Sequence, residues 1–142
     1  MAPTQNFGAS NKKKIMIYNG SCHCKAVTFQ VEAPDKVDVE DCNCSICLKT
    51  GFLHLIVPIN KFTLLTGKNH ITTYTYNTGV AQHYFCNTCG IKSFYIPRSN
   101  PDGMDINVRC LDEQPSTINI IKFDGQHWEG HAHTLAHKSK PD

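Results

Sequence analysis

The chain has 142 residues, with 14 lysines and arginines against 12 aspartates and glutamates, which leaves a net charge of +2. This length is sufficient for one domain with its own hydrophobic core. The sequence has no basic stripe of the kind that binds nucleic acid, so a nucleic-acid partner is not favoured. It also lacks a run of eighteen apolar residues, so no membrane span is expected.

Residues 1–14 are polar and include the triplet Lys12, Lys13 and Lys14. Nothing in them can bury a face, so we expect a disordered N-terminal tail. No secretory signal is recognisable. We therefore expect the protein in a reducing compartment, the cytoplasm or the nucleus, where thiols persist and bind metal.

From Ile15 onward, short segments rich in β-branched and aromatic residues alternate with turn residues, which is typical of strands. The segment 71–77 alternates strictly and is expected to form a hairpin with 82–85. No helix longer than a turn or two is indicated. The sequence therefore predicts a mainly β fold in a single domain. The apolar stretch at 62–67 ends in a glycine turn. Strands are expected at 15–18, 27–31, 37–41, 52–57, 71–77, 82–85, 93–96, 106–110 and 118–123.

Seven of the eight cysteines lie in three short clusters. Residues i and i+2 of a strand point to the same face, so Cys22 and Cys24 can present two thiolates to one metal ion. Cys86 and Cys89 bracket a tight turn and can do the same. The natural pairing joins these four cysteines in a closed, tetrahedral zinc site.

That pairing leaves Cys42, Cys44 and Cys47 together. Three protein ligands with one open position are typical of a reactive zinc rather than a structural one. Two alternatives stay open. The eight cysteines could form a disulfide scaffold, or both zinc ions could be structural, with Cys110 or a histidine completing the second site. Cys110 itself is most simply a buried small apolar residue.

At these cysteines the sequence resembles the glutathione-dependent formaldehyde-activating enzyme and centromere protein V family. The resemblance rests on motifs at 20–24, 41–47 and 85–90, in the same order and spacing, and covers roughly residues 15–128. Within the family, the segments 70–77 and 93–101 look most like the animal centromere protein V branch.

The resemblance implies a zinc-binding domain at 15–128 with a β-tent fold. It implies that Cys22, Cys24, Cys86 and Cys89 hold a structural zinc, and that the remaining three clustered cysteines hold a catalytic one. The implied enzyme is a carbon–sulfur lyase of the S-(hydroxymethyl)glutathione synthase type. It would add glutathione or a related thiol to formaldehyde, or cleave such an adduct.

The sequence departs from the family at two places. The centromere protein V branch has a long basic N-terminal extension, whereas this chain has a short tail. Lys25 stands where the enzyme branch usually has glycine. The alternative function is a non-catalytic, zinc-stabilised module that interacts with centromeres or microtubules.

Several residues are candidates for the substrate site. Arg98 is the preferred partner for a substrate carboxylate, ahead of Lys49 and Arg109, because its loop is rich in turn residues. His54 and Tyr95 are candidate general acids, although a histidine in an apolar strand is more typical of a core.

The histidine-rich segment 129–142 lacks apolar periodicity, and we expect it to form a solvated C-terminal tail. The exposed edges of a strand-rich fold would permit a homodimer.

Overall fold

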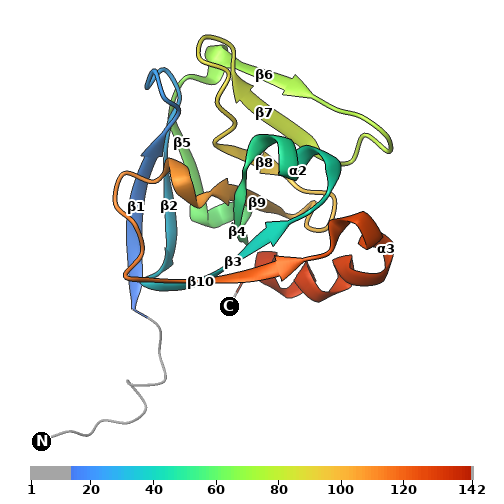
Figure 1. Ribbon diagram of the computed structural model, residues 1–142. Helices are drawn as coiled ribbons and strands as arrows, with labels where there is room; N and C mark the ends of the chain where they lie inside the picture. Colours follow the sequence, from blue (N-terminus) through green and yellow to red (C-terminus); the bar gives the residue numbers. More distant parts are fainter. Residues whose placement is uncertain (1–13, 142) are drawn as a thin grey trace, which may run out of the picture.

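The computed structural model describes residues 14–141, so the predicted N-terminal tail lies outside the described residues apart from Lys14. The described chain is mainly β, as predicted (Figure 1). No helix in the described part is long and apolar enough to cross a membrane. In chain order the elements are β1 (Ile15–Ser21), β2 (Thr28–Pro34), β3 (Lys36–Cys42), α2 (Ser45–Thr50), β4 (Leu53–Pro58), η1 (Ile59–Lys61), β5 (Phe62–Thr66), η2 (Lys68–His70), β6 (Ile71–Tyr74), β7 (Gln82–Cys86), β8 (Phe94–Ile96), β9 (Gly103–Asn107), η3 (Val108–Cys110), β10 (Thr117–Phe123), η4 (Gly125–His127), α3 (Trp128–His131) and η5 (Ala132–Ser139).

The strands form two sheets. A three-stranded sheet has the order β1-β2-β5, and a seven-stranded sheet has the order β10-β3-β4-β9-β8-β7-β6. The predicted hairpin is present as the antiparallel pair β6 and β7. All neighbours in the larger sheet are antiparallel except β10 and β3, which run parallel. In Figure 1 the two sheets lie at an angle to each other.

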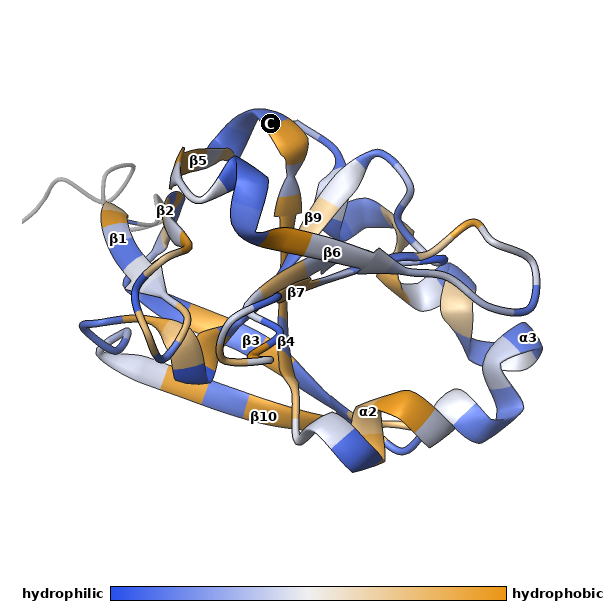
Figure 2. Ribbon diagram, turned by 90° about the horizontal axis from the view of Figure 1, so that it is seen from above, coloured by the Kyte–Doolittle hydropathy of each residue, from blue (hydrophilic) through white to orange (hydrophobic). Residues whose placement is uncertain are grey.

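Side chains from both sheets form one hydrophobic core. Phe29 of β2 is completely buried, and its ring stacks on Phe62 at 5.7 Å and meets Phe94 edge-on at 5.5 Å. Burying a side chain of this size stabilises the fold by about 1.5–3 kcal/mol. β10, at the edge, alternates hydrophobic and hydrophilic residues along part of its length (Figure 2).

Alternate residues of the central strands reach opposite sides of the larger sheet. On β4, Leu55 belongs to the core, whereas His54 lines a pocket. On β9, Ile106 belongs to the core and Asp105 lines the same pocket. These strands are buried on both faces, which explains why the sequence of β4 reads as an almost continuous apolar run.

The predicted strand at 106–110 ends earlier than expected. β9 stops at Asn107, and residues 108–110 form the 3-10 turn η3. The Asn107 side chain accepts a hydrogen bond from the backbone N–H of Arg109 at 3.1 Å. Such local side-chain bonds compete with the strand ladder, and apolar alternation in a sequence does not reveal them.

The expectation of a solvated C-terminal tail differs from the structure. Residues in this segment form α3 and the eight-residue 3-10 helix η5, which is longer than the helices expected. Ala132 and Leu135 are buried. Figure 1 places this part of the chain beside β3 and the end of β10.

Polar contacts hold the segment in place. Asn100 is 1% exposed and donates to the Leu135 carbonyl at 2.8 Å and to Ser139 Oγ at 2.9 Å. Lys138 Nζ lies 2.7 and 2.8 Å from the two carboxylate oxygens of buried Glu40 on β3. Hydrophobic periodicity carries no information about such contacts, which is why the sequence pattern did not predict them.

Lys25 has φ of 66°, in the left-handed region that residues with a Cβ disfavour. Its backbone N–H donates to the Cys22 carbonyl at 3.2 Å, so it closes a turn immediately after the first cysteine pair. The glycine usual in the enzyme branch at this position fits this geometry without strain.

We therefore expect Lys25→Gly to stabilise the folded protein by about 0.5–1 kcal/mol. Urea midpoints at a fixed zinc concentration would measure the change. Lys36→Gly, at an exposed strand position, is the matched control and should destabilise by a similar amount. A lower midpoint for Lys25→Gly would contradict the argument.

Candidate metal centres and pocket

The four-thiol group consists of Cys22, Cys24, Cys86 and Cys89, whose sulfur atoms all lie within 4.8 Å of one another. The Sγ atoms of Cys22 and Cys24 are 3.7 Å apart, and those of Cys24 and Cys86 are 3.6 Å apart. Sulfurs bound at about 2.3 Å to a tetrahedral zinc ion are separated by about 3.8 Å. The spacing of the donor atoms therefore fits a closed zinc site.

Two turns deliver these thiols. The first pair follows the end of β1, and Cys86 ends β7, where Gly90 with φ of 78° closes the second turn. Backbone N–H groups of Val27 and Thr88 donate to the sulfurs of Cys22 and Cys86, both at 3.4 Å. Such bonds favour the thiolate form that a metal requires.

The three-thiol group consists of Cys42 at the end of β3, Cys44 at the N-cap of α2 and Cys47 within α2. Hydrogen bonding to Cys42 and Cys47 lowers the pKa of Cys44. Hydrogen bonding to Cys44 raises the pKa of Cys42 to about 11, and both neighbours raise the pKa of Cys47. Cys44 therefore ionises easily, whereas Cys42 and Cys47 resist ionisation unless a cation offsets the repulsion among the three thiolates. A divalent metal ion would do so, and thiolates are preferred zinc ligands.

All eight cysteines are free thiols, so the disulfide scaffold is not what the structure shows. Within residues 14–141, neither Cys110 nor a histidine joins the three-thiol group. Cys110 is half-buried rather than buried, and burial raises the pKa of its thiol.

His54 lies beside the three-thiol group. Its Nε2 is 3.2 Å from Cys47 Sγ, and its Nδ1 is 2.7 Å from a carboxylate oxygen of Asp105. The Tyr95 hydroxyl lies 3.3 Å from the same Nδ1, and burial raises the pKa of Tyr95, so this hydroxyl keeps its proton. His54 is thus both a buried histidine with partners and a neighbour of the thiols.

The loop after β10 closes over the three-thiol group. The Asn43 side chain accepts from the backbone N–H of Gln126 at 3.0 Å and donates to Asp124 at 3.2 Å. Gly125 passes so close to Cys42 that a Cβ at this position would collide with its sulfur. Only glycine allows this approach.

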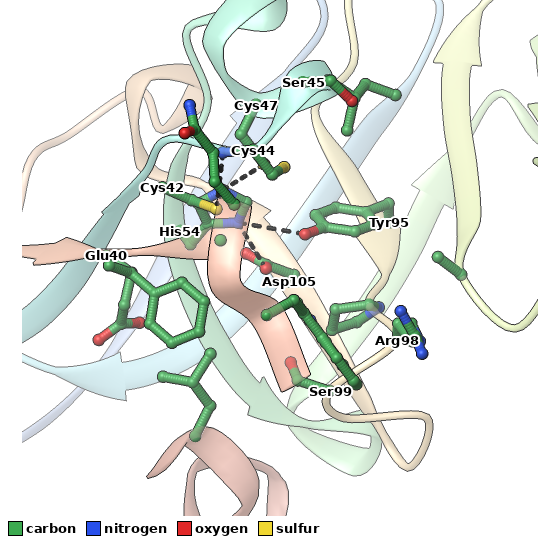
Figure 3. Close-up of a pocket in the computed structure, with 18 of the residues that line it drawn as sticks. Glu40, Cys42, Cys44, Ser45, Cys47, His54, Tyr95, Arg98, Ser99 and Asp105 are labelled. Atoms are coloured by element: carbon green, nitrogen blue, oxygen red, sulfur yellow. Dashed lines mark hydrogen bonds and ion pairs between the residues drawn. The ribbon is translucent and has the colours of Figure 1, made fainter. Parts of the chain in front are cut away.

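A pocket of about 860 Å³ opens onto the three-thiol group. Cys42, Cys44 and Cys47 line it together with His54 and Tyr95, as Figure 3 shows. The four-thiol group contributes nothing to its lining. The two groups therefore differ in access as well as in the number of thiols.

Arg98 also lines this pocket, set apart from the cysteines in Figure 3, whereas the other two cationic candidates, Lys49 and Arg109, do not. Its guanidinium lies 3.8 Å from the centre of the Trp128 ring and donates to Glu129 at 2.7 Å. The Glu129 side chain is 80% exposed, so that bond is open to competition by a ligand.

Asp105 and Gly125 were missed at the level of sequence. Asp105 stands between the apolar residues Met104 and Ile106, and an acid within an apolar strand is a usable signal of a buried partner. Gly125 had no signal, because its role depends on a loop that meets the cysteines only in the folded chain.

Comparison with known proteins places this geometry in a family. Residues 17–128 match the profile of the glutathione-dependent formaldehyde-activating enzyme family. The chain belongs to this family.

A protein of Halomonas elongata, provisionally named a glutathione-dependent formaldehyde-activating enzyme, is 34% identical over 82 residues. The aligned part covers 52% of each of the two chains, so the similarity spans about half the length of this relative. A Rhodobacter sphaeroides protein of known crystal structure is 31% identical with a TM-score of 0.65, covering 72% of this chain and 99% of that one.

We expect Cys86→Ser to unfold the domain. A structural zinc contributes about 10–16 kcal/mol of apparent binding free energy, which exceeds the net stability of about 5–15 kcal/mol of a typical domain. Circular dichroism and metal analysis of the purified variant would measure the effect. Cys110→Ser, outside both thiol groups, is the matched control and should remain folded. A folded Cys86→Ser variant with two zinc ions would refute the assignment.

Proposed function

We propose that the protein binds two zinc ions and acts as a carbon–sulfur lyase that adds glutathione, or a related thiol, to formaldehyde, or cleaves the resulting S-hydroxymethyl adduct. One observation carries the proposal: the three-thiol group lines the large pocket, whereas the four-thiol group does not. In this proposal Cys22, Cys24, Cys86 and Cys89 hold a structural ion. The three pocket thiols are the residues of the catalytic site.

The donor set favours a thiol substrate. Three thiolates would give a site holding Zn²⁺ a formal charge of about −1, which makes it a weak acid toward water. When bound there, zinc would keep a substrate thiol in its nucleophilic thiolate form. Cys42, Cys44 and Cys47 therefore support sulfur chemistry better than activation of water.

Arg98 supplies a position for a carboxylate of glutathione. Its guanidinium is already oriented by the Trp128 ring and by Glu129. A substrate carboxylate can replace the single bond to Glu129 with a two-pronged bond to the guanidinium. The substrate would then extend from Arg98 toward the three-thiol group within one pocket.

His54 and Tyr95 remain candidates for holding a proton at the reacting group. Asp105 fixes the orientation of the His54 ring, as carboxylates do for histidines near metal and catalytic sites. The hydroxyl of Tyr95 is protonated and lies within the same buried cluster. In this role both residues would act from the pocket wall beside Cys47.

The alternative is the non-catalytic module related to centromere protein V, in the cytoplasm or the nucleus. It would need metal for stability but no accessible metal position. The two hypotheses therefore differ in how the three-thiol group responds to a small thiol.

We expect reduced, metal-free protein to bind two equivalents of cobalt(II), with glutathione shifting the spectrum of only one of them. Thiolate-to-metal and d–d absorption bands would report the number of sites and whether one is open. S-methylglutathione lacks the thiol and is the matched control, which should cause no shift. Indifference of both sites to glutathione would remove the physical basis of the catalytic proposal.

We expect Arg98→Ala to weaken glutathione binding about 10- to 100-fold, the usual effect of losing a charge-assisted hydrogen bond. Both zinc ions should remain, because Arg98 belongs to neither thiol group. Calorimetric titration would measure the affinity, and Arg109→Ala, exposed and outside the pocket, serves as the control. Unchanged affinity would exclude Arg98 from the site.

A further inference from the structure

His83 on β7 is a buried histidine with one unused nitrogen. It is 4% exposed, and it lines the same pocket as the three-thiol group. Lys92 Nζ lies 2.7 Å from His83 Nδ1, whereas His83 Nε2 is buried and has no hydrogen-bond partner within residues 14–141. Buried polar atoms are nearly always paired, so this nitrogen calls for an explanation.

Lys92 fixes the tautomer of the imidazole. Burial, followed by the charge of Lys92, lowers the pKa of His83 to about 4, and burial lowers the pKa of Lys92 to about 8. At neutral pH the lysine is therefore charged and the histidine neutral. An ammonium group can only donate, so Nδ1 accepts and the ring proton lies on Nε2. Nε2 is thus a donor that lacks an acceptor.

The position of Lys92 shows which side of the ring is available. Lys92 packs over the Tyr95 ring at 3.9 Å and over Phe52 at 5.2 Å, and it does not line the pocket. His83 does line it. Since Nδ1 is directed to the lysine, Nε2 is the one ring nitrogen left for a ligand in the pocket that His83 lines.

Tyr76 covers this part of the pocket. Its ring stacks on His83 at 5.5 Å, and Tyr76 is 41% exposed in the segment between β6 and β7. The backbone bonds of this segment are local, from Gly79 N–H to the Tyr76 carbonyl and from Val80 N–H to Thr78 Oγ1. The Tyr76 ring could therefore move to admit a ligand beside His83 without breaking a sheet bond.

His83 is also connected to the reactive end of the pocket. It stacks on Tyr95 with 4.9 Å between ring centres, and the Tyr95 hydroxyl reaches His54, which lies beside Cys47. His83 and the three thiols also line one and the same pocket. An oxygen on a small substrate at the thiols is therefore a suitable acceptor for Nε2–H.

We propose that the Nε2–H of His83 donates a hydrogen bond to the aldehyde oxygen of the substrate, with Lys92 as the positioning residue that fixes the tautomer. This inference rests on the proposed function. The substrate thiolate forms a bond to the aldehyde carbon, and the C=O π electrons move to the oxygen, where His83 stabilises the negative charge. A proton from solvent, equivalent to the one the thiol lost, completes the S-hydroxymethyl product. Cleavage reverses these steps, and His83 gives up no proton.

The first test is the tautomer in the zinc-loaded protein labelled with ¹⁵N-histidine. Long-range ¹H–¹⁵N spectra distinguish a protonated from an unprotonated ring nitrogen, and the signal lost in His83→Gln assigns the residue. We expect His83 with the proton on Nε2, and loss of that preference in Lys92→Met. A proton on Nδ1 in the wild type would overturn the proposal.

The second test is the protein-dependent exchange between ¹³C-formaldehyde and its glutathione adduct, followed by NMR exchange spectroscopy. His83→Phe keeps an aromatic ring between Tyr76 and Tyr95 but removes the donor. We expect it to lower the protein-dependent rate about 100-fold, as loss of one oxyanion donor does. His83→Gln retains an N–H near the Nε2 position and should recover most of the rate, whereas a merely structural role would not be rescued in this way.

Tyr74→Phe, at the exposed outer end of the same aromatic stack, is the matched control and should exchange at the wild-type rate. Wild-type rates in His83→Phe, with both zinc ions bound, would overturn the role of His83 and leave the proposed function intact. A wild-type protein that neither binds glutathione nor accelerates exchange would overturn both.

Discussion

Thiolates repel one another, and this fold holds seven cysteines in two groups where that repulsion matters. In the three-thiol group the neighbours make one thiol acidic and suppress ionisation of the other two. Such an arrangement is stable as an ionised set only around a cation. The placement of β1, β3, β7 and α2 can therefore be understood as delivering sulfur atoms to two points in space.

The larger sheet separates two environments by simple alternation. Its central strands direct one set of side chains into a hydrophobic core and the other set into the pocket. His54 and Asp105 pair across neighbouring strands on the pocket side. A buried acid and a buried histidine are tolerated there because Asp105 Oδ2 pairs with His54 Nδ1, although Asp105 Oδ1 has no partner among residues 14–141. The polar cluster beside Cys47 is thus a product of strand register and not of a flexible loop.

Much of this arrangement could be predicted from local sequence patterns. The spacing of Cys42, Cys44 and Cys47 determines that they can meet, because a strand end and one helical turn bring residues two and three apart together. The alternation in 71–77 likewise predicted the β6–β7 hairpin. These signals depend only on neighbours along the chain.

The parts that escaped prediction depend on side-chain hydrogen bonds, most of them between residues far apart in the sequence. Asn100 and Glu40 hold the C-terminal segment by polar bonds that leave no hydrophobic pattern. The Asn107 side chain ends β9 early through a local bond that competes with the sheet. The sequence analysis also gave no role to His83, because its significance lies in Lys92 and in a pocket that only the folded chain assembles.

The loop that closes over Cys42 is synthesised late in translation, after the cysteines that it covers. Gly125 and the buried Leu135 follow all eight cysteines in the chain, so they leave the ribosome after them. At about 5–20 residues per second, the pocket thiols spend on the order of ten seconds without this wall. During that interval they lie in solvent, where an ionised thiol is open to oxidation. Early capture of metal by the nascent chain would protect the sulfur atoms before the pocket around them exists.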